Sequence, residues 1–243
     1  MINKNILITG ATSGIGGALV DRFSLNGDNV IACGRNEVQL NALSDKVMQT
    51  CSFDMTDPSA IENEALKVGE LDVLVLNAGT CLYIDVDDEK NFNGNTFQEV
   101  INTNLTSLGW LLAYFLPKVK EGGQVVFISS SATIVPFPRS EAYGASKAGM
   151  DYLAKSLRLD LAKHNIGVSL VHPGFIKTPL TDKNDFSMPF LLTSEEAANR
   201  IFKGILAKKR YIHFPKRLTL LLKLFSFFPS SLWQAMLTRN NNQ

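Results

Sequence analysis

The sequence has 243 residues, of which 45% are hydrophobic and 19% are charged, and its formal net charge is +1. This length suits one α/β domain with a substantial core, and the charge balance excludes the basic field expected of a nucleic-acid-binding protein. The three cysteines lack the spacing of metal ligands, so we expect neither a disulfide framework nor a metal site. Because no basic segment and apolar run precede a cleavage site, we expect no signal peptide and a cytoplasmic protein.

The first predicted elements are a strand, a glycine-rich turn and a helix. The apolar run Asn5–Thr9 ends in Gly-Ala-Thr-Ser-Gly-Ile-Gly at residues 10–16, after which apolar residues recur at helical spacing. Glycines in such a turn let the backbone approach a pyrophosphate, and the free N–H groups at the helix start attract its negative charge. This arrangement predicts a dinucleotide site with the candidate contacts Gly10, Thr12, Ser13, Gly14, Ile15 and Gly16.

A second predicted strand, Asn29–Cys33, bears on the choice of dinucleotide. In dinucleotide-binding folds an acidic side chain at the end of this strand accepts a hydrogen bond from the 2′-hydroxyl of NAD, whereas an arginine pairs with the 2′-phosphate of NADP. No Asp or Glu occurs between Val30 and Asn36, and Arg35 is present. The sequence therefore predicts NADP(H), with a solvated loop arginine as the alternative interpretation of Arg35.

Strands and helices continue to alternate through the middle of the chain. The predicted elements are strands at 48–53 and 71–76, an exposed loop at 80–95 and a long helix from 97 to about 118. Asn104 lies inside this helical pattern. Asparagine is a poor residue for the middle of a helix because its side chain tends to bond nearby backbone groups. Asn104, and the nearby Asn102 as the alternative, are therefore unusual residues in this predicted helix.

The reactive side chains are concentrated between Ser129 and Lys147. A buried strand is predicted at Val125–Ile128, and Ser130 follows its end. The next helical pattern opens at Tyr143, so Lys147 lies one turn on, with the two Cβ atoms about 5–6 Å apart. A free phenol has a pKa of about 10, and an ammonium one turn away is expected to lower it, so that Tyr143 can serve as general acid and base. The Ser130 hydroxyl is placed to bond the same substrate oxygen.

These residues resemble the catalytic Ser–Tyr–Lys of the classical short-chain dehydrogenase/reductase family. The Thr-Gly-x-x-x-Gly-x-Gly pattern at residues 9–16 is similar to the glycine motif of this family. The Asn-Ala-Gly at 77–79 and the Pro-Gly-x-x-x-Thr at 173–178 are similar to two more of its motifs. The resemblance runs from about Ile6 to Thr178.

The resemblance implies roles for further residues. It implies a catalytic set of Asn104, Ser130, Tyr143 and Lys147, in which Asn104 holds a water that relays protons to Lys147. It also implies these cofactor contacts besides the glycine turn and Arg35: Asp54 beside the adenine, Met55, Asn77, Ala78, Gly79, Tyr143, Lys147, Pro173, Gly174, Ile176 and Thr178.

The last part of the chain is expected to close over substrate. Residues 179–209 are predicted to form a mobile lid followed by a helix, and Tyr211–Phe214 a last strand. We expect substrate specificity to lie in three loops, 81–95, 134–141 and 180–192.

Residues 215–239 are predicted to be an apolar helical extension, unlike the C-terminus of better-known relatives. The run Leu218–Phe228 is eleven residues long and contains Lys223, whereas a bilayer span needs about 20 apolar residues. Packing or dimer contact is the favoured interpretation. A peripheral membrane contact through 215–237 is the second, and a wall of a hydrophobic substrate pocket is the third.

Taken in order, the elements predict a single domain over residues 1–243. We expect a doubly wound Rossmann fold whose mostly parallel sheet, of about seven strands, carries helices on both faces. The resemblance implies the reduction of a small ketone or aldehyde by a homodimer or homotetramer. Arg35 predicts NADP(H) as the cofactor, and the phenylalanine- and leucine-rich C-terminus predicts a hydrophobic substrate. An NAD-dependent alcohol dehydrogenase and a non-catalytic NADP-binding regulator are the alternatives. No nucleic-acid partner is expected.

Overall fold

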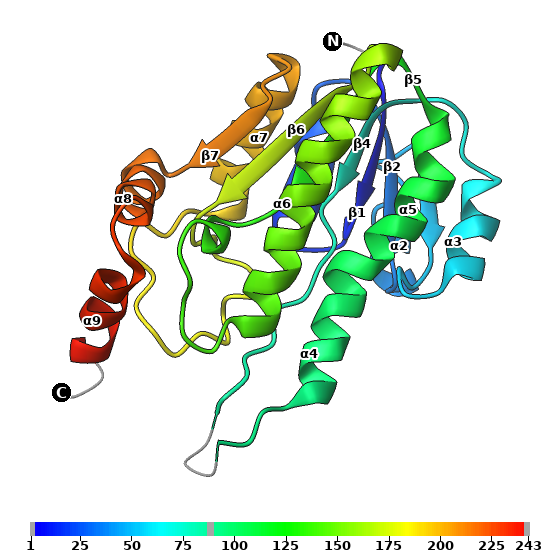
Figure 1. Cartoon of the computed structure of the whole chain (residues 1–243). Helices are drawn as coiled ribbons and strands as arrows, with labels where there is room; N and C mark the ends of the chain where they lie inside the picture. Colours follow the sequence, from blue (N-terminus) through cyan, green and yellow to red (C-terminus); the bar gives the residue numbers. More distant parts are fainter. Residues whose placement is uncertain (1–2, 87–89, 241–243) are drawn as a thin grey trace.

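The computed structural model describes residues 3–86 and 90–240, with only the backbone for 236–240. Within them the chain forms a seven-stranded sheet in the order β3-β2-β1-β4-β5-β6-β7 (Figure 1). Every neighbouring pair of strands is parallel. The strands are β1 (Asn5–Thr9), β2 (Asn29–Gly34), β3 (Gln49–Ser52), β4 (Leu71–Leu76), β5 (Val119–Ile128), β6 (Gly167–Pro173) and β7 (Tyr211–Phe214).

Helices cover both faces of this sheet, as Figure 1 shows. They are α1 (Gly14–Ser24), α2 (Glu37–Asn41), α3 (Pro58–Ala65), α4 (Gly94–Ile101), α5 (Ser107–Phe115), α6 (Glu141–Leu161), α7 (Ser194–Leu206), α8 (Lys216–Ser226) and α9 (Ser230–Asn240). On one face α5 and α6 bury Leu111 and Met150. On the other α1 and α7 bury Leu19 and Ile201. The predicted doubly wound Rossmann fold is therefore confirmed.

The alternation of side chains along β1 divides the core in two. Ile6 and Ile8 belong to the cluster under α1 and α7, whereas Leu7 belongs to the cluster under α5 and α6. Successive residues of a strand point to opposite faces, and a parallel sheet covered on both faces buries both sets. This is why the sequence of β1 is an unbroken apolar run.

The strand order creates a crevice at the carboxyl ends of the strands, between β1 and β4. From β1 the chain proceeds outward through β2 and β3, and then it returns to β4 on the other side of β1. In open parallel sheets, ligands bind outside the carboxyl ends of the strands at such a switch point. Here those ends lead into Gly10 after β1 and Asn77 after β4.

The long helix predicted from 97 to about 118 is not uniform. The chain is helical from Gly94, but between α4 and α5 it widens into a π turn at Asn102–Thr106. A π turn replaces the ordinary hydrogen-bond pattern of an α-helix and is often found at functional sites. The predicted loop 80–95 contains residues 87–89, which lie outside the described residues; its other residues have no regular structure before α4.

The C-terminal segment is helical, as predicted, and follows the edge strand β7. Helices α8 and α9 lie at the outer side of the molecule in Figure 1. The predicted lid at 180–192 is irregular and is fixed near its end by a bridge between Ile176 and Leu192. Within the described ranges, no helix combines the length and apolar character needed to cross a bilayer.

Candidate active site

The glycine-rich turn has the backbone geometry of a close-approach site. Gly10 and Gly14 have positive φ angles of 65° and 54°, a region that glycine adopts without steric cost. At Gly16 a Cβ atom would lie 2.0 Å from the Gly10 carbonyl oxygen and 2.5 Å from Asn77 Nδ2. Ser13, the N-cap of α1, makes no side-chain capping bond, so N–H groups of the first turn remain available to an anion.

Replacing Gly16 with alanine is expected to weaken nucleotide binding at least about tenfold, because the Cβ clash with the Gly10 carbonyl forces the turn to open. The matched control is Gly17→Ala, whose nearest neighbour, the Ala11 oxygen, would lie 3.5 Å from the new Cβ. Fluorescence titration with NADPH and a thermal melt measure both variants. Equal affinities for Gly16→Ala and wild type would rule out this turn as the phosphate site.

Asn77 joins the ends of β1 and β4 beside the turn. Its Nδ2 donates to the carbonyl oxygens of Thr9 (2.9 Å) and Gly10 (3.3 Å). Thr9 Oγ1 in turn accepts from the backbone N–H groups of Asn77 and Ala78, at 3.0 and 3.1 Å. This reciprocal set of bonds holds the floor of the crevice in one shape.

A cavity of about 510 Å³ runs along the carboxyl ends of the strands. Every predicted cofactor or catalytic residue lines it except Gly16 and Asn104, which lie directly behind the lining. The structure also places residues in the lining that the sequence analysis did not select, among them Asn36, Gln39 and Thr80. Asn36 and Gln39 follow Arg35 closely in the sequence. Because Asn36 is the N-cap of α2 and Gln39 lies in its first turn, the helix start explains both residues, and the sequence gives no separate indication that they line a cavity.

Arg35 lies at one end of the cavity and forms an exposed ion pair. Its Nη1 is 3.3 Å from Asp54 Oδ2, and its side chain is 75% exposed. Partial burial favours a higher pKa for Asp54, but hydrogen bonds from Thr56 and Arg35 hold that pKa below its ordinary value. An ion pair this exposed contributes at most about 1 kcal/mol. The guanidinium can therefore leave Asp54 and bind an incoming anion at a small cost in free energy.

Ser130, Tyr143 and Lys147 all line this cavity. Lys147 is buried, its Nζ donates to the Ile128 carbonyl oxygen (2.9 Å), and it lies 5.9 Å from the centre of the Tyr143 ring. A Cβ at Gly79 would lie 3.5 Å from that Nζ. This is an ordinary contact distance, so the backbone at Gly79 lies directly beside the lysine head, and the closer neighbour is Asn104 Oδ1 at 3.0 Å.

The pKa values of Tyr143 and Lys147 differ from the expectation. Burial, with a smaller contribution from Cys81, raises the pKa of Tyr143, and a hydrogen bond from Ser130 opposes this rise. Burial also lowers the pKa of Lys147 to about 8, against the charges of Asp151 and Cys81. The expected lowering of the Tyr143 pKa is therefore wrong, because desolvation of the phenol outweighs the effect of a lysine whose ammonium bonds the Ile128 carbonyl oxygen.

Asn104 is fully buried in the π turn, whereas Asn102 is exposed. Its Oδ1 accepts from Thr80 N (2.8 Å), and its Nδ2 donates to the Thr80 oxygen (2.8 Å) and to Ser146 Oγ (3.0 Å). These bonds link the loop after β4 to α6 beside Lys147. With its side-chain amide occupied in this way, Asn104 holds the surrounding backbone in place.

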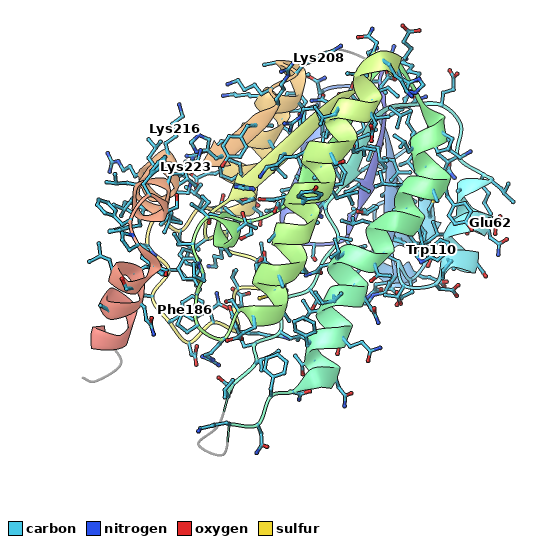
Figure 2. The ribbon with its side chains drawn as sticks, in the orientation of Figure 1. Glu62, Trp110, Phe186, Lys208, Lys216 and Lys223 are labelled. Atoms are coloured by element: carbon cyan, nitrogen blue, oxygen red, sulfur yellow. The ribbon has the colours of Figure 1, made fainter. Side chains whose placement is uncertain are left out.

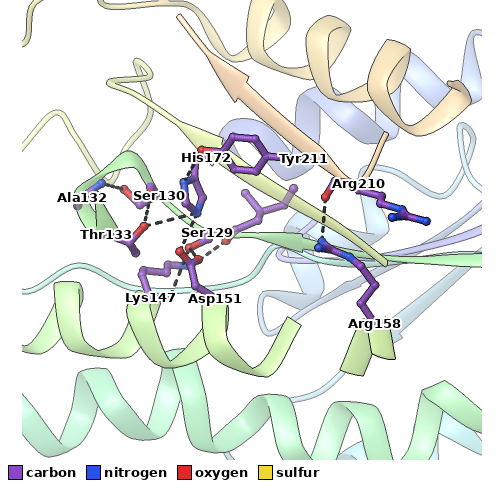
Figure 3. A network of polar contacts seen from close by, with 11 residues as sticks. Ser129, Ser130, Ala132, Thr133, Lys147, Asp151, Arg158, His172, Arg210 and Tyr211 are labelled. Atoms are coloured by element: carbon purple, nitrogen blue, oxygen red, sulfur yellow. Dashed lines mark hydrogen bonds and ion pairs between the residues drawn. The ribbon is translucent and has the colours of Figure 1, made fainter. Parts of the chain in front are cut away.

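A buried polar network lies behind Ser130 and Lys147, as Figure 3 shows. Ser129 Oγ donates to Asp151 Oδ1 (2.5 Å), and Asp151 Oδ2 is 2.8 Å from His172 Nε2. On its other side, His172 Nδ1 is 3.0 Å from the Tyr211 hydroxyl. Burial acts to raise the pKa of Asp151, but His172 and Ser129 bring it below the ordinary value. The sequence analysis missed Asp151; its only signal is a carboxylate four residues after Lys147 on the inner face of α6.

The three loops predicted to set specificity come together at Arg139. Its guanidinium pairs with Asp85 and, at 2.9 Å, with Asp185. The ring of Phe186, which is labelled in Figure 2, lies 6.0 Å from the Tyr83 ring, centroid to centroid. Contacts between loops distant in sequence thus hold these three segments together just before α6, the helix that carries Tyr143 and Lys147.

Comparisons with known proteins agree on one family. The profile of the short chain dehydrogenase family matches residues 4–187. The chain is 32% identical to an uncharacterized oxidoreductase of Myxococcus xanthus over 98% of both chains.

Two solved structures illustrate the likeness in fold. One is a short chain dehydrogenase/reductase from Burkholderia phymatum in complex with NAD, with a TM-score of 0.81, 20% identity and 92% of each chain covered. The other is a short chain dehydrogenase from Burkholderia cenocepacia in complex with NADP, with a TM-score of 0.76 and 23% identity over 87% of this chain and 96% of that chain.

Proposed function

Since the chain belongs to the short-chain dehydrogenase/reductase family of oxidoreductases, which act on CH–OH and C=O groups with a nicotinamide cofactor, we propose that it reduces a ketone or aldehyde with NADPH. The observation that carries the proposal is the meeting of Ser130, Tyr143 and Lys147 in the cavity that the glycine turn also lines. The proposed proton donor and the proposed dinucleotide site thus share one cavity.

The residues present fit a dinucleotide. The turn at Gly10–Gly16 has no room for added Cβ atoms at Gly10 and Gly16 and offers N–H groups to a pyrophosphate. Arg35 is placed for a 2′-phosphate and Lys147 for the nicotinamide ribose. The remaining proposed contacts are Thr12, Ser13, Ile15, Asp54, Met55, Asn77, Ala78, Gly79, Pro173, Gly174, Ile176 and Thr178.

The proposed chemistry divides between cofactor and protein. When bound, the nicotinamide supplies the hydride that reduces the carbonyl carbon. Ser130 and Tyr143 hydrogen-bond the carbonyl oxygen, and the Tyr143 hydroxyl gives that oxygen a proton, so the C=O bond becomes an alcohol. An ordinary phenol already keeps its proton at neutral pH, and burial, which raises the pKa of Tyr143 further, keeps that proton in place until negative charge develops on the carbonyl oxygen. Lys147, whose pKa is about 8, is mostly cationic at neutral pH and can help to replace that proton.

Replacing Arg35 with aspartate is expected to weaken NADPH binding about 10–100-fold and to leave NADH binding nearly unchanged, because only NADPH offers a 2′-phosphate to the guanidinium. The control is Lys46→Asp, which also removes an exposed ion-paired cation, 3.0 Å from Asp21, but lies outside the cavity lining. Fluorescence titration with both nucleotides reads out the effect. An equal loss for both would remove the basis for NADPH preference.

The same titration on wild type separates the alternatives. Preference for NADH would favour an NAD-dependent alcohol dehydrogenase that uses the same Tyr143 as a base. Binding of neither nucleotide would favour a non-catalytic protein. A homodimer or homotetramer, a cytoplasmic location and a hydrophobic substrate stay predictions. The last of these is supported by the phenyl rings of Phe175, which follows the cavity residue Gly174, and of Phe186 in the lid, whose centres are 6.1 Å apart.

A further inference from the structure

Helix α8 is amphipathic, but it has a second apolar face that no side chain of the described residues covers. Its inner face packs Leu218 and Leu222 against Val135. On the outer face, Leu220 and Leu224 are 56% and 54% exposed, and Phe227 is 86% exposed. The spacing of four and three residues places these side chains in one outward row. Leu221, Phe228 and Leu232 extend the exposed apolar surface toward α9.

The same surface is basic. Residues 215–243 contain four lysines and arginines and no aspartate or glutamate, whereas the rest of the chain has more acidic than basic residues. Lys216 and Arg217 are exposed in the first turn of α8, and Figure 2 shows Lys216 and Lys223 on this helix at the outer side of the molecule. Among the ion pairs of the described residues, none involves Lys216 or Arg217. The partly exposed Lys223 makes no ion pair there either, but its Nζ lies 4.3 Å from the centre of the Tyr211 ring.

A partner that binds this surface must offer an apolar region to the leucine side chains and negative charge to the lysines and arginines. A second copy packed on the same helix through a two-fold axis would bring the two basic clusters together without acidic partners. A span of the bilayer is excluded, since the helix has only 11 residues. A bilayer surface with anionic head groups satisfies both requirements, because apolar side chains enter the acyl boundary while lysines and arginines reach the phosphates.

We propose that the outer face of α8 and the start of α9 dock on an anionic lipid bilayer surface. The docking helices pack directly against residues of the cavity wall and of the loop after Ser130. A Cβ at the cavity residue Gly174 would lie 2.8 Å from Leu218 Cδ2, and Trp233 Nε1 donates to the Pro136 oxygen at 2.6 Å. Pro136 belongs to the loop that follows Ser130. Docking therefore sets the orientation of the cavity mouth relative to the lipid.

Co-sedimentation with vesicles tests the proposal on the full chain. Wild type is expected to pellet with vesicles of 3:1 phosphatidylcholine and phosphatidylglycerol and to bind much less to phosphatidylcholine alone or at high salt. The variant Leu220→Ser/Leu224→Ser/Phe227→Ser should lose at least about tenfold in partitioning. Each charge removed in Lys216→Gln/Arg217→Gln should cost about fivefold on the anionic vesicles.

The matched control is Leu25→Ser/Leu66→Ser, which removes leucines that are 83% and 79% exposed on other parts of the molecule. It should pellet like wild type. Light scattering after size exclusion and a thermal melt check assembly and folding of each variant. The proposal is overturned if wild type stays in the supernatant with every vesicle. It is also overturned if the triple variant only converts an oligomer to a smaller species, since a second copy would then cover the face.

Discussion

Replacing Tyr143 with phenylalanine is expected to lower kcat for carbonyl reduction by about 10²–10⁴-fold, which is the usual contribution of a positioned general acid. The change removes one hydroxyl from a half-buried ring and leaves the ring's packing intact. Nucleotide affinity should change little, because the glycine turn and Arg35 are untouched. The measurement is NADPH oxidation over a panel of aldehydes and ketones, together with nucleotide titration.

The control for Tyr143→Phe is Tyr152→Phe on the same helix. Tyr152 is 78% exposed and does not line the cavity, so its loss should leave kcat and thermal stability unchanged. A Tyr143→Phe enzyme that reduced its substrate as fast as wild type would contradict the assignment of the proton donor. A loss of NADPH binding in Tyr143→Phe would instead indicate that the hydroxyl acts through the cofactor.

The elements that the sequence predicted well are those whose signals are local. The strand Leu71–Leu76 was predicted with its observed bounds because an apolar run there ends at the Asn-Ala-Gly turn. The start of α3 also has a local signal, since Asp57 caps it and Pro58 occupies its first turn. Because the strands are parallel, the motifs that follow their carboxyl ends all lie at the same end of the sheet. The residues that line the cavity therefore follow from local patterns.

Features that depend on packing between distant segments were not predictable in the same way. The π turn around Asn104 leaves the helical spacing of apolar residues unchanged, so the sequence shows one continuous helix. The direction of the Tyr143 pKa shift depends on burial by the surrounding loops, whereas the sequence reveals only the lysine one turn away. What covers α8 is also a tertiary question, since its apolar pattern alone is equally consistent with a core helix.

The buried network of Asp151 is the largest feature that sequence analysis missed. Asp151 and His172 are 21 residues apart and come from α6 and β6, which lie against each other only in the fold. In the sequence, a single aspartate on an amphipathic helix is most simply explained as a solvated residue. Its burial with Ser129 and His172 makes it a positioning group for the chain on either side of Ser130 and for the helical turn that carries Lys147.

Replacing Asp151 with alanine is expected to lower the free energy of unfolding by about 3–5 kcal/mol at neutral pH, because it leaves buried partners without their carboxylate. The pKa of Asp151 is lower in the folded protein than its ordinary value. Its contribution is therefore fully present above the unfolded pKa of about 4 and is lost as the pH falls through the folded pKa. The difference between wild type and variant should thus shrink below about pH 4 in denaturant titrations.

The control, Asp160→Ala, removes an exposed carboxylate from the same helix and should change stability by less than about 0.5 kcal/mol. If the role of Asp151 were purely structural, its replacement would change only the stability of the protein. Its charge, however, also raises the pKa of Lys147 against the effect of burial. In Asp151→Asn, which keeps the side-chain shape, the pKa of Lys147 should fall below about 8. The alkaline limb of the pH–rate profile should then move to lower pH relative to wild type. An unmoved profile in a folded Asp151→Asn enzyme would restrict Asp151 to holding the fold together.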